Sequence, residues 1–240
     1  MEKAIIGKKL GMTQIFDEAG KVIPVTVIQA GPCTVVQKKT EEKDGYVAVQ
    51  LGFEEVPERK LTKPELGHSK KAGKALRILK EFQLDNAATL NVGDEITANV
   101  FAAGDRVDIT GISKGHGYQG PVKRHGGHIQ KMSHGGGPVH RHAGSMGSTT
   151  DPSRIFKGHN GAGQMGNEQV TVMNLDVVKV DEELGVIAVR GAVPGPKGGV
   201  VALRTSVKKV KVAQVVEAGR VNPQKASARV NPQKASARNK

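Results

Sequence analysis

The amino-acid sequence predicts a mainly β protein, and among β folds it favours a closed antiparallel barrel over a sandwich. Short runs rich in β-branched residues recur at regular spacing, with turn residues between them, as in barrels and sandwiches. Such runs lie on both sides of residues 109–150, a long segment without Asp or Glu. Strands on the two sides must share one core, and a closed barrel leaves no bare strand edge for non-specific pairing.

Ten strands are expected, at residues 22–30, 34–37, 46–51, 95–101, 106–110, 169–172, 175–180, 186–189, 200–203 and 207–212. Pro24 confines the start of the first strand to a sheet edge or a bulge, because proline has no backbone N–H to donate. Asp44-Gly45 is a turn signal before the third strand. A turn at residues 182–185 separates the run ending at 180 from the run beginning at 186.

One helix is expected at residues 69–82, inside an otherwise β chain. Apolar side chains recur there at helical spacing, with Lys and Arg between them; they are Ala72, Ala75, Leu76, Ile78, Leu79 and Phe82.

Residues 109–150 cannot form a hydrophobic core of their own. The segment holds eleven glycines, five Lys or Arg and few large apolar side chains, and five of the eight histidines of the chain lie between His125 and His142. A flexible cationic segment of this kind needs something outside the chain to order it, and nucleic-acid phosphates are the simplest candidate. If it leaves the barrel near residue 111 and returns near 165, each arm of about twenty-five residues reaches at most roughly 80–90 Å.

The charge distribution supports the same interpretation. The net charge is +13, yet residues 1–108 carry sixteen charges of each sign, so the excess lies in the remainder of the chain. Phosphate contacts are expected first from the acid-free segment, then from its flanks, and the histidines can donate to phosphate or 2′-hydroxyl oxygens. The expected contacts are Lys8, Lys9, Lys114, Lys123, Arg124, His125, His128, Lys131, His134, His140, Arg141, His142, Arg154 and Lys157.

Composition limits the other function classes. There is no Trp, and Tyr118 is the only aromatic residue of the acid-free segment, so contact with backbone and shape is favoured over base stacking. The single cysteine, Cys33, sits in an apolar run and is interpreted as a buried, inert thiol. Neither a signal peptide nor a membrane span is indicated, and a reducing, cytoplasmic location is expected.

The sequence offers three catalytic or ligand-binding alternatives. Residues 115–120 match G-x-G-x-x-G, but Pro121 follows at once and the acid of a dinucleotide site is missing. His125, His128, His134, His140 and His142 could bind a metal, yet the segment supplies neither cysteine nor the carboxylates that orient histidine ligands. Ser133, His134 and Asp151 carry the side chains of a hydrolase triad without a nucleophile elbow. A histidine-based metalloprotein or enzyme and a general DNA binder remain the rival hypotheses.

Several motifs resemble bacterial large-subunit ribosomal protein three. The resemblance covers about residues 1–212 in the right order, and it is carried by residues 7–16, 23–28, 62–68, 107–115, 133–135, 144–147, 156–158, 163–168 and 192–195. The duplicated nonapeptide of residues 221–229 and 230–238 lies outside the family pattern.

The resemblance implies a closed six-stranded translation-protein-type barrel with a small α/β insert and a long irregular extension. It implies a body of residues 1–110 and 166–212, an insert at about 56–90, an extension at 111–165 and a basic tail at 213–240. It also implies a structural, non-enzymatic protein of the ribosome that binds large-subunit (23S) ribosomal RNA and neighbouring ribosomal proteins, acts early in assembly, and uses no cofactor, small-molecule substrate or membrane.

The family extension runs toward the peptidyl-transferase centre, where its tip supports the RNA without supplying catalytic groups. The resemblance places the tip at Gly144, Ser145, Met146, Gly147, Ser148, Thr149, Thr150, Asp151, Pro152 and Ser153. Thr150 stands where some relatives have a methylated glutamine, so that modification is not expected. His125 follows Lys123-Arg124 where relatives often have an aromatic residue.

Overall fold

A computed structural model describes residues 2–208. The strands are β1 (Ala4–Phe16), β2 (Val22–Ala30), β3 (Cys33–Lys39), β4 (Ala48–Glu55), β5 (Leu76–Phe82), β6 (Glu95–Ile96), β7 (Arg106–Ile112), β8 (Gly117–Gln119), β9 (Gly163–Met165), β10 (Gln169–Asp181), β11 (Val186–Arg190) and β12 (Val200–Thr205). The helices are α1 (Glu41–Asp44), α2 (Lys63–Ser69) and α3 (Pro121–His125), with 3-10 turns η1 (Glu58–Lys60), η2 (Lys70–Ala72) and η3 (Ala98–Val100).

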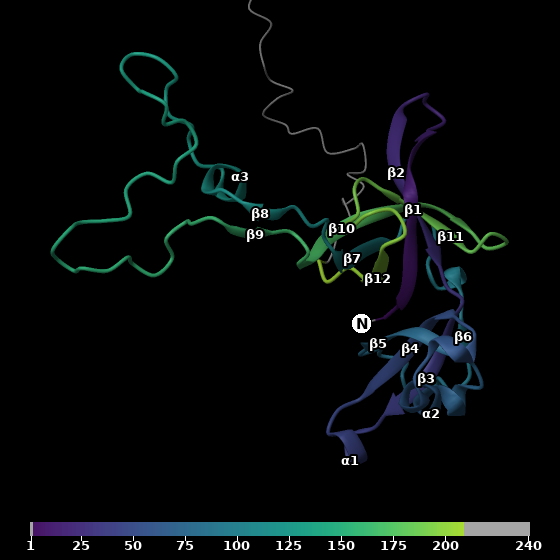
Figure 1. The fold of residues 1–240 in the computed structure, drawn as a ribbon. Helices are drawn as coiled ribbons and strands as arrows, with labels where there is room; N and C mark the ends of the chain where they lie inside the picture. Colours follow the sequence, from purple (N-terminus) through teal and green to yellow (C-terminus); the bar gives the residue numbers. More distant parts are fainter. Residues whose placement is uncertain (1, 209–240) are drawn as a thin grey trace, which may run out of the picture. The chain divides into compact units, whose positions relative to one another are not determined.

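Six antiparallel strands close into a barrel in the order β1-β12-β7-β10-β11-β2 (Figure 1). Three of them precede the acid-free segment and three follow it. Strand β12 pairs with both β1 and β7, from Ala4↔Arg204 and Val201↔Gly111 onward. The barrel can close only when both parts of the chain are present, which confirms the expected mainly β fold with one shared core.

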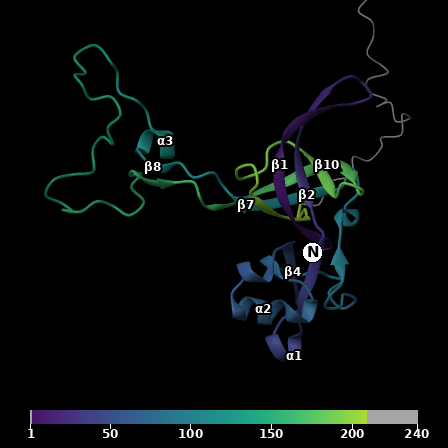
Figure 2. The same cartoon turned by 45° about the vertical axis from the view of Figure 1, so that its right-hand side comes forward.

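The connection between β2 and β7 forms a second sheet, in the order β5-β4-β3-β6 (Figures 1 and 2). Helix α2 and the turns η1 and η2 lie in the connection between β4 and β5. A capping box begins α2: the Glu65 carboxylate accepts hydrogen bonds from the Thr62 N–H and hydroxyl, both at 2.8 Å. These bonds satisfy groups that a helix start otherwise leaves without partners.

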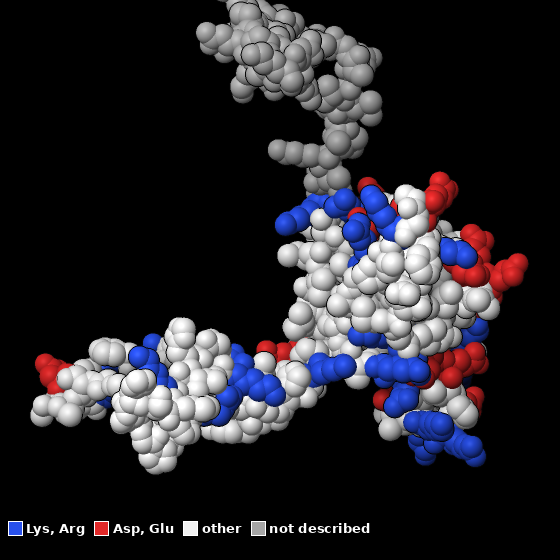
Figure 3. Space-filling model, turned by 90° about the horizontal axis from the view of Figure 1, so that it is seen from above, with Lys and Arg blue, Asp and Glu red and all other residues white. Residues whose placement is uncertain are grey.

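The extension leaves the barrel after β7 and returns to it at β10. Near the barrel its two arms pair as the short ladder β8-β9, from Gly117↔Met165 to Gln119↔Gly163. Figure 3 shows Lys and Arg side chains along this segment, with little acidic surface between them.

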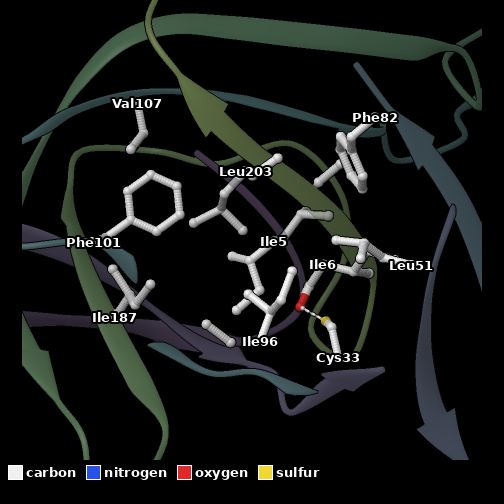
Figure 4. Close-up of a cluster of buried hydrophobic side chains, with 14 of the residues drawn as sticks. Ile5, Ile6, Cys33, Leu51, Phe82, Ile96, Phe101, Val107, Ile187 and Leu203 are labelled. Atoms are coloured by element: carbon white, nitrogen blue, oxygen red, sulfur yellow. Dashed lines mark hydrogen bonds between the residues drawn. The ribbon is translucent and has the colours of Figure 1, made fainter. Parts of the chain in front are cut away.

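One hydrophobic core joins the barrel to the second sheet. Ile5, Ile187 and Leu203 from barrel strands are fully buried, and they belong to the same cluster as Leu51 and Phe82 of the second sheet (Figure 4). Burial of these side chains from water is the main favourable term that holds the two sheets together.

Several strand predictions are confirmed, the helix prediction is wrong, and the strand prediction at 95–101 is wrong over most of its length. The expected helix at 69–82 is strand β5 over most of its length, because Leu76, Ile78 and Phe82 also fit a period of two and β5 pairs with β4 from Val49↔Phe82 onward. The expected strand at 95–101 pairs only at Glu95–Ile96 and then turns into η3. Strand β1 was missed. Val207 lies in a bend, and residues 209–212 and the duplicated nonapeptide fall outside the described residues.

Candidate nucleic-acid interface

No residue from 112 to 176 is buried. Even the large apolar side chains of the extension face solvent: Tyr118 and Met132 are each 77% exposed. The segment therefore gains almost nothing from the hydrophobic effect, which is the dominant favourable term in folding. Its conformation in the chain alone rests on backbone hydrogen bonds and a few polar contacts.

Backbone contacts join the two arms where they meet the barrel. The N–H of Ser113 donates to the Glu168 carbonyl at 2.9 Å, and the N–H of His116 donates to the Met165 carbonyl at 2.8 Å. Gly166 has a φ of +73°, and a Cβ added there would lie 2.0 Å from the Lys114 carbonyl oxygen. Only glycine fits a left-handed position at such a close approach.

Helix α3 places two of the predicted cations against the opposite arm. Proline at its first turn favours its start, and Gly126, with a φ of 67°, ends it. The Arg124 guanidinium donates to the Gly161 carbonyl at 3.1 Å, and His125 Nε2 lies 3.2 Å from the same oxygen. A Cβ on Gly163 would lie 2.6 Å from Arg124 Nη1, so the glycine makes room for the guanidinium.

A hollow of about 490 Å³ forms between the arms at this point. Its lining includes five side chains that can donate hydrogen bonds to an anion: Lys114, His116, Arg124, His125 and Gln164. It also includes one acid, Glu168. An arginine next to a lysine and two imidazoles suits a phosphate group. Sequence analysis missed His116 and Gln164 as members of this group. The only signal was that His116 lies within the G-x-G-x-x-G run.

The remaining predicted contacts of the extension are open to a partner. Those with exposed side chains are Lys123, His128, Lys131, His134, Arg141, His142, Arg154 and Lys157. The Arg154 guanidinium lies 5.3 Å from the centre of the Phe156 ring, a cation–π contact that orients it. His140 is half-buried, and its Nδ1 has no hydrogen-bond partner within the described chain.

The two lysines of β1 differ in their surroundings. Lys8 is half-buried and lies 3.1 Å from a carboxylate oxygen of Glu54. Lys9 is only 9% exposed, and its ammonium donates to the carbonyls of Val193 at 2.6 Å and Gly195 at 3.0 Å. Burial, and next the charge of Lys114, hold the pKa of Lys9 below its usual 10.5. Lys9 is thus engaged inside the protein.

Every residue of the expected tip is exposed except Pro152, which is half-buried. Asp151 is the only acid between residues 109 and 167. The Ser145 hydroxyl accepts a hydrogen bond from the Gly147 N–H at 3.2 Å, which closes a small turn. Nothing in this arrangement resembles a catalytic group held in place by its surroundings.

The described residues do not form the metal site or the dinucleotide site that were considered from the sequence. Within residues 2–208, no group of three or more His, Cys, Asp or Glu side chains is placed to hold a metal ion. Helix α3 does follow the G-x-G-x-x-G run, but it has only five residues. No helix in the described part of the chain has both the length and the hydropathy needed to span a membrane.

The sequence profile described as Ribosomal protein L3 matches residues 67–185. The matched range contains β5 and β7, the whole extension and β10.

Proposed function

Because the chain belongs to the ribosomal protein L3 family, whose members are structural proteins of the large ribosomal subunit, we propose that it binds large-subunit ribosomal RNA through its extension. The observation that carries this proposal is the combination of exposed cations and missing acids. One acid occurs between residues 112 and 167, and no residue there is buried. A polyanion that binds here therefore meets little charge repulsion and does not disrupt any hydrophobic core.

The proposed RNA contacts are the exposed and half-buried cations predicted from the sequence. They are Lys8, Lys114, Lys123, Arg124, His125, His128, Lys131, His134, His140, Arg141, His142, Arg154 and Lys157. Lys9 is left out because its ammonium is already bound to two carbonyls. His116 and Gln164 join the set because they line the hollow beside Arg124.

RNA also supplies what the extension lacks as a folding unit. Fixing the backbone of one residue costs about 1–2 kcal/mol, and the extension has no core with which to offset that cost. Glycines permit RNA to approach the backbone closely. We propose that the extension becomes ordered as RNA folds around it, which suits a protein that joins the subunit early in assembly.

The proposed organisation follows from these roles. The body comprises residues 1–110 and 166–212, with an insert at about 56–90, and it docks on folded RNA and on neighbouring ribosomal proteins. The extension, residues 111–165, carries the tip at 144–153 toward the peptidyl-transferase centre, where it supports the RNA without catalysis. The tail, residues 213–240, adds a basic segment. The protein acts in the cytoplasm as part of the ribosome.

The salt dependence of RNA binding tests the proposal. We would replace residues 120–160 by a short Gly-Ser linker, which leaves β8 and β9 in place, and measure affinity for large-subunit RNA at several salt concentrations. The deletion removes six Lys or Arg residues. If all six contact phosphate, the slope of log K against log[salt] flattens by about 4–5, because each contact contributes roughly 0.7–0.9.

Two controls complete this test. A DNA duplex of equal length measures general affinity for polyanions, and the proposal requires the wild-type protein to prefer the RNA. A variant with Lys21 and Lys43 changed to Gln, both exposed and outside the extension, should keep the full slope. An unchanged slope after deletion of the extension would show that the segment does not contact phosphate.

Hydrogen exchange provides a second measurement. In the free protein, amides of residues 127–160 should exchange rapidly, and in assembled subunits they should be protected. Strong protection in the free protein would contradict the view that RNA orders the extension.

A further inference from the structure

A second group of cations lies on the connection between β4 and β5, far from the extension in sequence. Between residues 59 and 80 there are eight Lys or Arg and one acid, Glu65. Six of the cations are exposed. Arg77 lies in β5 near Glu54; the other five, which we call the insert surface, are Arg59, Lys60, Lys63, Lys70 and Lys71. The surface spans η1, α2 and η2.

The acids nearby do not neutralise the insert surface. Both carboxylate contacts of Glu65 go to Thr62 in the capping box. Lys74 is paired with Glu95, and Arg77 lies 3.8 Å from a carboxylate oxygen of Glu54. Within residues 2–208, none of the five side chains of the insert surface forms an ion pair or a hydrogen bond.

Helix geometry gathers part of this charge on one side of α2. Lys63, Gly67 and Lys70 stand at positions i, i+4 and i+7, which lie on one face of an α-helix. Lys70 keeps helical dihedral angles, with φ −54° and ψ −37°. The two lysines are separated along the axis by about 10 Å, at 1.5 Å per residue, with the glycine between them.

Gly67 has no role that the chain itself explains. Its φ lies outside the left-handed region, and a Cβ added there would meet nothing within 4 Å. Glycine is a poor helix former, so neither conformation nor packing favours it over alanine at this position. It leaves bare helix backbone between two lysines, beside a hollow lined by Glu58, Leu66, Lys70, Gly73 and Lys74. Glu58 is the one acid of this hollow.

The chemistry of this face fits a polyanion better than a protein. Large exposed apolar side chains are absent between residues 58 and 75 of the described chain. Protein interfaces have an apolar centre and are depleted in lysine, whereas phosphate backbones are bound by Lys and Arg and approached closely at glycine. We propose that the insert surface is a second phosphate-binding site of this protein, which holds a segment of large-subunit RNA independently of the extension.

This proposal rests on the proposed function, and charge-neutral variants test it in the full-length protein. Lys63 and Lys70 would both be changed to Gln, with Lys21→Gln plus Lys43→Gln as a control of equal net charge. The first pair should flatten the salt slope for large-subunit RNA by about 1.4–1.8, at roughly 0.7–0.9 per phosphate contact. The control pair should leave the slope unchanged.

Gly67→Gln tests the bare backbone without changing the charge. Glutamine is a better helix former than glycine, and open space is available for it. The melting temperature should therefore stay equal or rise, while the affinity for RNA falls severalfold. Unchanged affinity would show that nothing approaches the helix at this point.

Directed cleavage can show where the insert surface lies on the RNA. Cys33 is buried, and burial raises its pKa to about 12, so a thiol-linked radical-generating reagent attaches only at an introduced cysteine. In assembled subunits, reagent on Lys70→Cys should cleave large-subunit RNA at nucleotides different from those cleaved from Lys131→Cys. Reagent on Lys43→Cys serves as the control.

The outcomes separate the two proposals. Cleavage from position 131 with none from position 70, or an unchanged slope in the Lys63 and Lys70 pair, overturns the second site and leaves the extension proposal standing. Cleavage from position 70 with none from position 131 supports the second site and counts against the extension. Failure of the wild-type protein to bind large-subunit RNA overturns both.

Discussion

Replacement of Lys9 by Met should destabilise the barrel far more than the loss of a surface lysine. Methionine keeps much of the apolar stem but removes the ammonium that donates to Val193 and Gly195. Each carbonyl that loses its donor in a buried site costs about 1–3 kcal/mol, so the variant, which leaves two such carbonyls, should lose about 2–6 kcal/mol. For a body of about 200 residues, each kcal/mol lowers the melting temperature by about 2–4 °C, so the fall should be about 4–24 °C.

Thermal and urea unfolding of wild type and variant provide the measurement, with Lys8→Met as the matched control. Lys8 forms a partly exposed ion pair with Glu54, and such pairs contribute only about 0–1 kcal/mol. Equal stability losses in the two variants would refute the assignment of Lys9 as a buried structural cation. Loss of RNA affinity with unchanged stability would refute it as well.

The pH dependence of the same comparison provides a second test. Burial, followed by the charge of Lys114, holds the pKa of Lys9 below its usual 10.5. Between the lowered folded value and the unfolded value, the unfolded chain binds more protons, so stability rises with pH in that window. The stability advantage of wild type over Lys9→Met should therefore grow as the pH approaches 10.5.

Three further predictions concern the core and the base of the extension. Ile109→Ala, at a fully buried position, should lower the free energy of unfolding in urea by about 2–5 kcal/mol. Ile112→Ala, at 48% exposure, should change it by at most about 0.5 kcal/mol. Equal losses in the two variants would contradict the barrel register. Cys33, buried with a raised pKa of about 12, should react with a thiol reagent only after unfolding, and rapid reaction of the native protein would argue against its burial. Gly166→Ala should cost at least about 1–2 kcal/mol of stability because of its left-handed φ, and it should reduce amide protection in β8 and β9. Gly120→Ala, where no atom lies within 4 Å of the added Cβ, should have neither effect.

The strands with a clear side-chain pattern could be predicted from the sequence. Strand β2 follows its β-branched run from Val22 to Ala30, and Pro24 lies beyond the residues that pair with β11, so its missing N–H leaves that ladder intact. Strand β1 has no such pattern, since glycines interrupt it. Gly7 is required there by contacts with β2: a Cβ would lie 2.6 Å from the Gln29 carbonyl oxygen. Such tertiary contacts cannot be read from a single run of residues.

The division of the strands between the barrel and the second sheet also could not be predicted from local sequence patterns. Alternation shows that a segment is extended, but it does not show which strand is its neighbour. The residues of β5 fit both a helical and a strand period, and pairing with β4 decided the outcome. The resemblance to a known family, and not the spacing of residues, predicted a six-stranded barrel with an insert.

The candidate interface could be predicted in outline because charge composition is visible in the sequence. The absence of acids from residues 109–150 required no structure, whereas only the structure shows that Glu168 lines the same hollow as Lys114 and Arg124. The sequence did not show that Lys9 points inward, because its neighbour Lys8 has the same chemistry and only the loop at 193–195 distinguishes the two. It also did not single out the insert surface, since residues 1–108 are neutral as a whole and only the structure shows that Glu65, Glu95 and Glu54 bond to other residues.

The pairing of Ile112 with Gln169 has a consequence for how this protein can evolve. The neighbouring strands β7 and β10 hold the two ends of the extension together, so the barrel closes whatever the length or sequence of the extension between them. Doubling the length of a flexible loop raises its closure cost by only about 0.6 kcal/mol. Insertions and deletions in residues 113–168 are therefore nearly neutral for the barrel, and natural selection can adjust the reach of the extension to the RNA that we propose it enters.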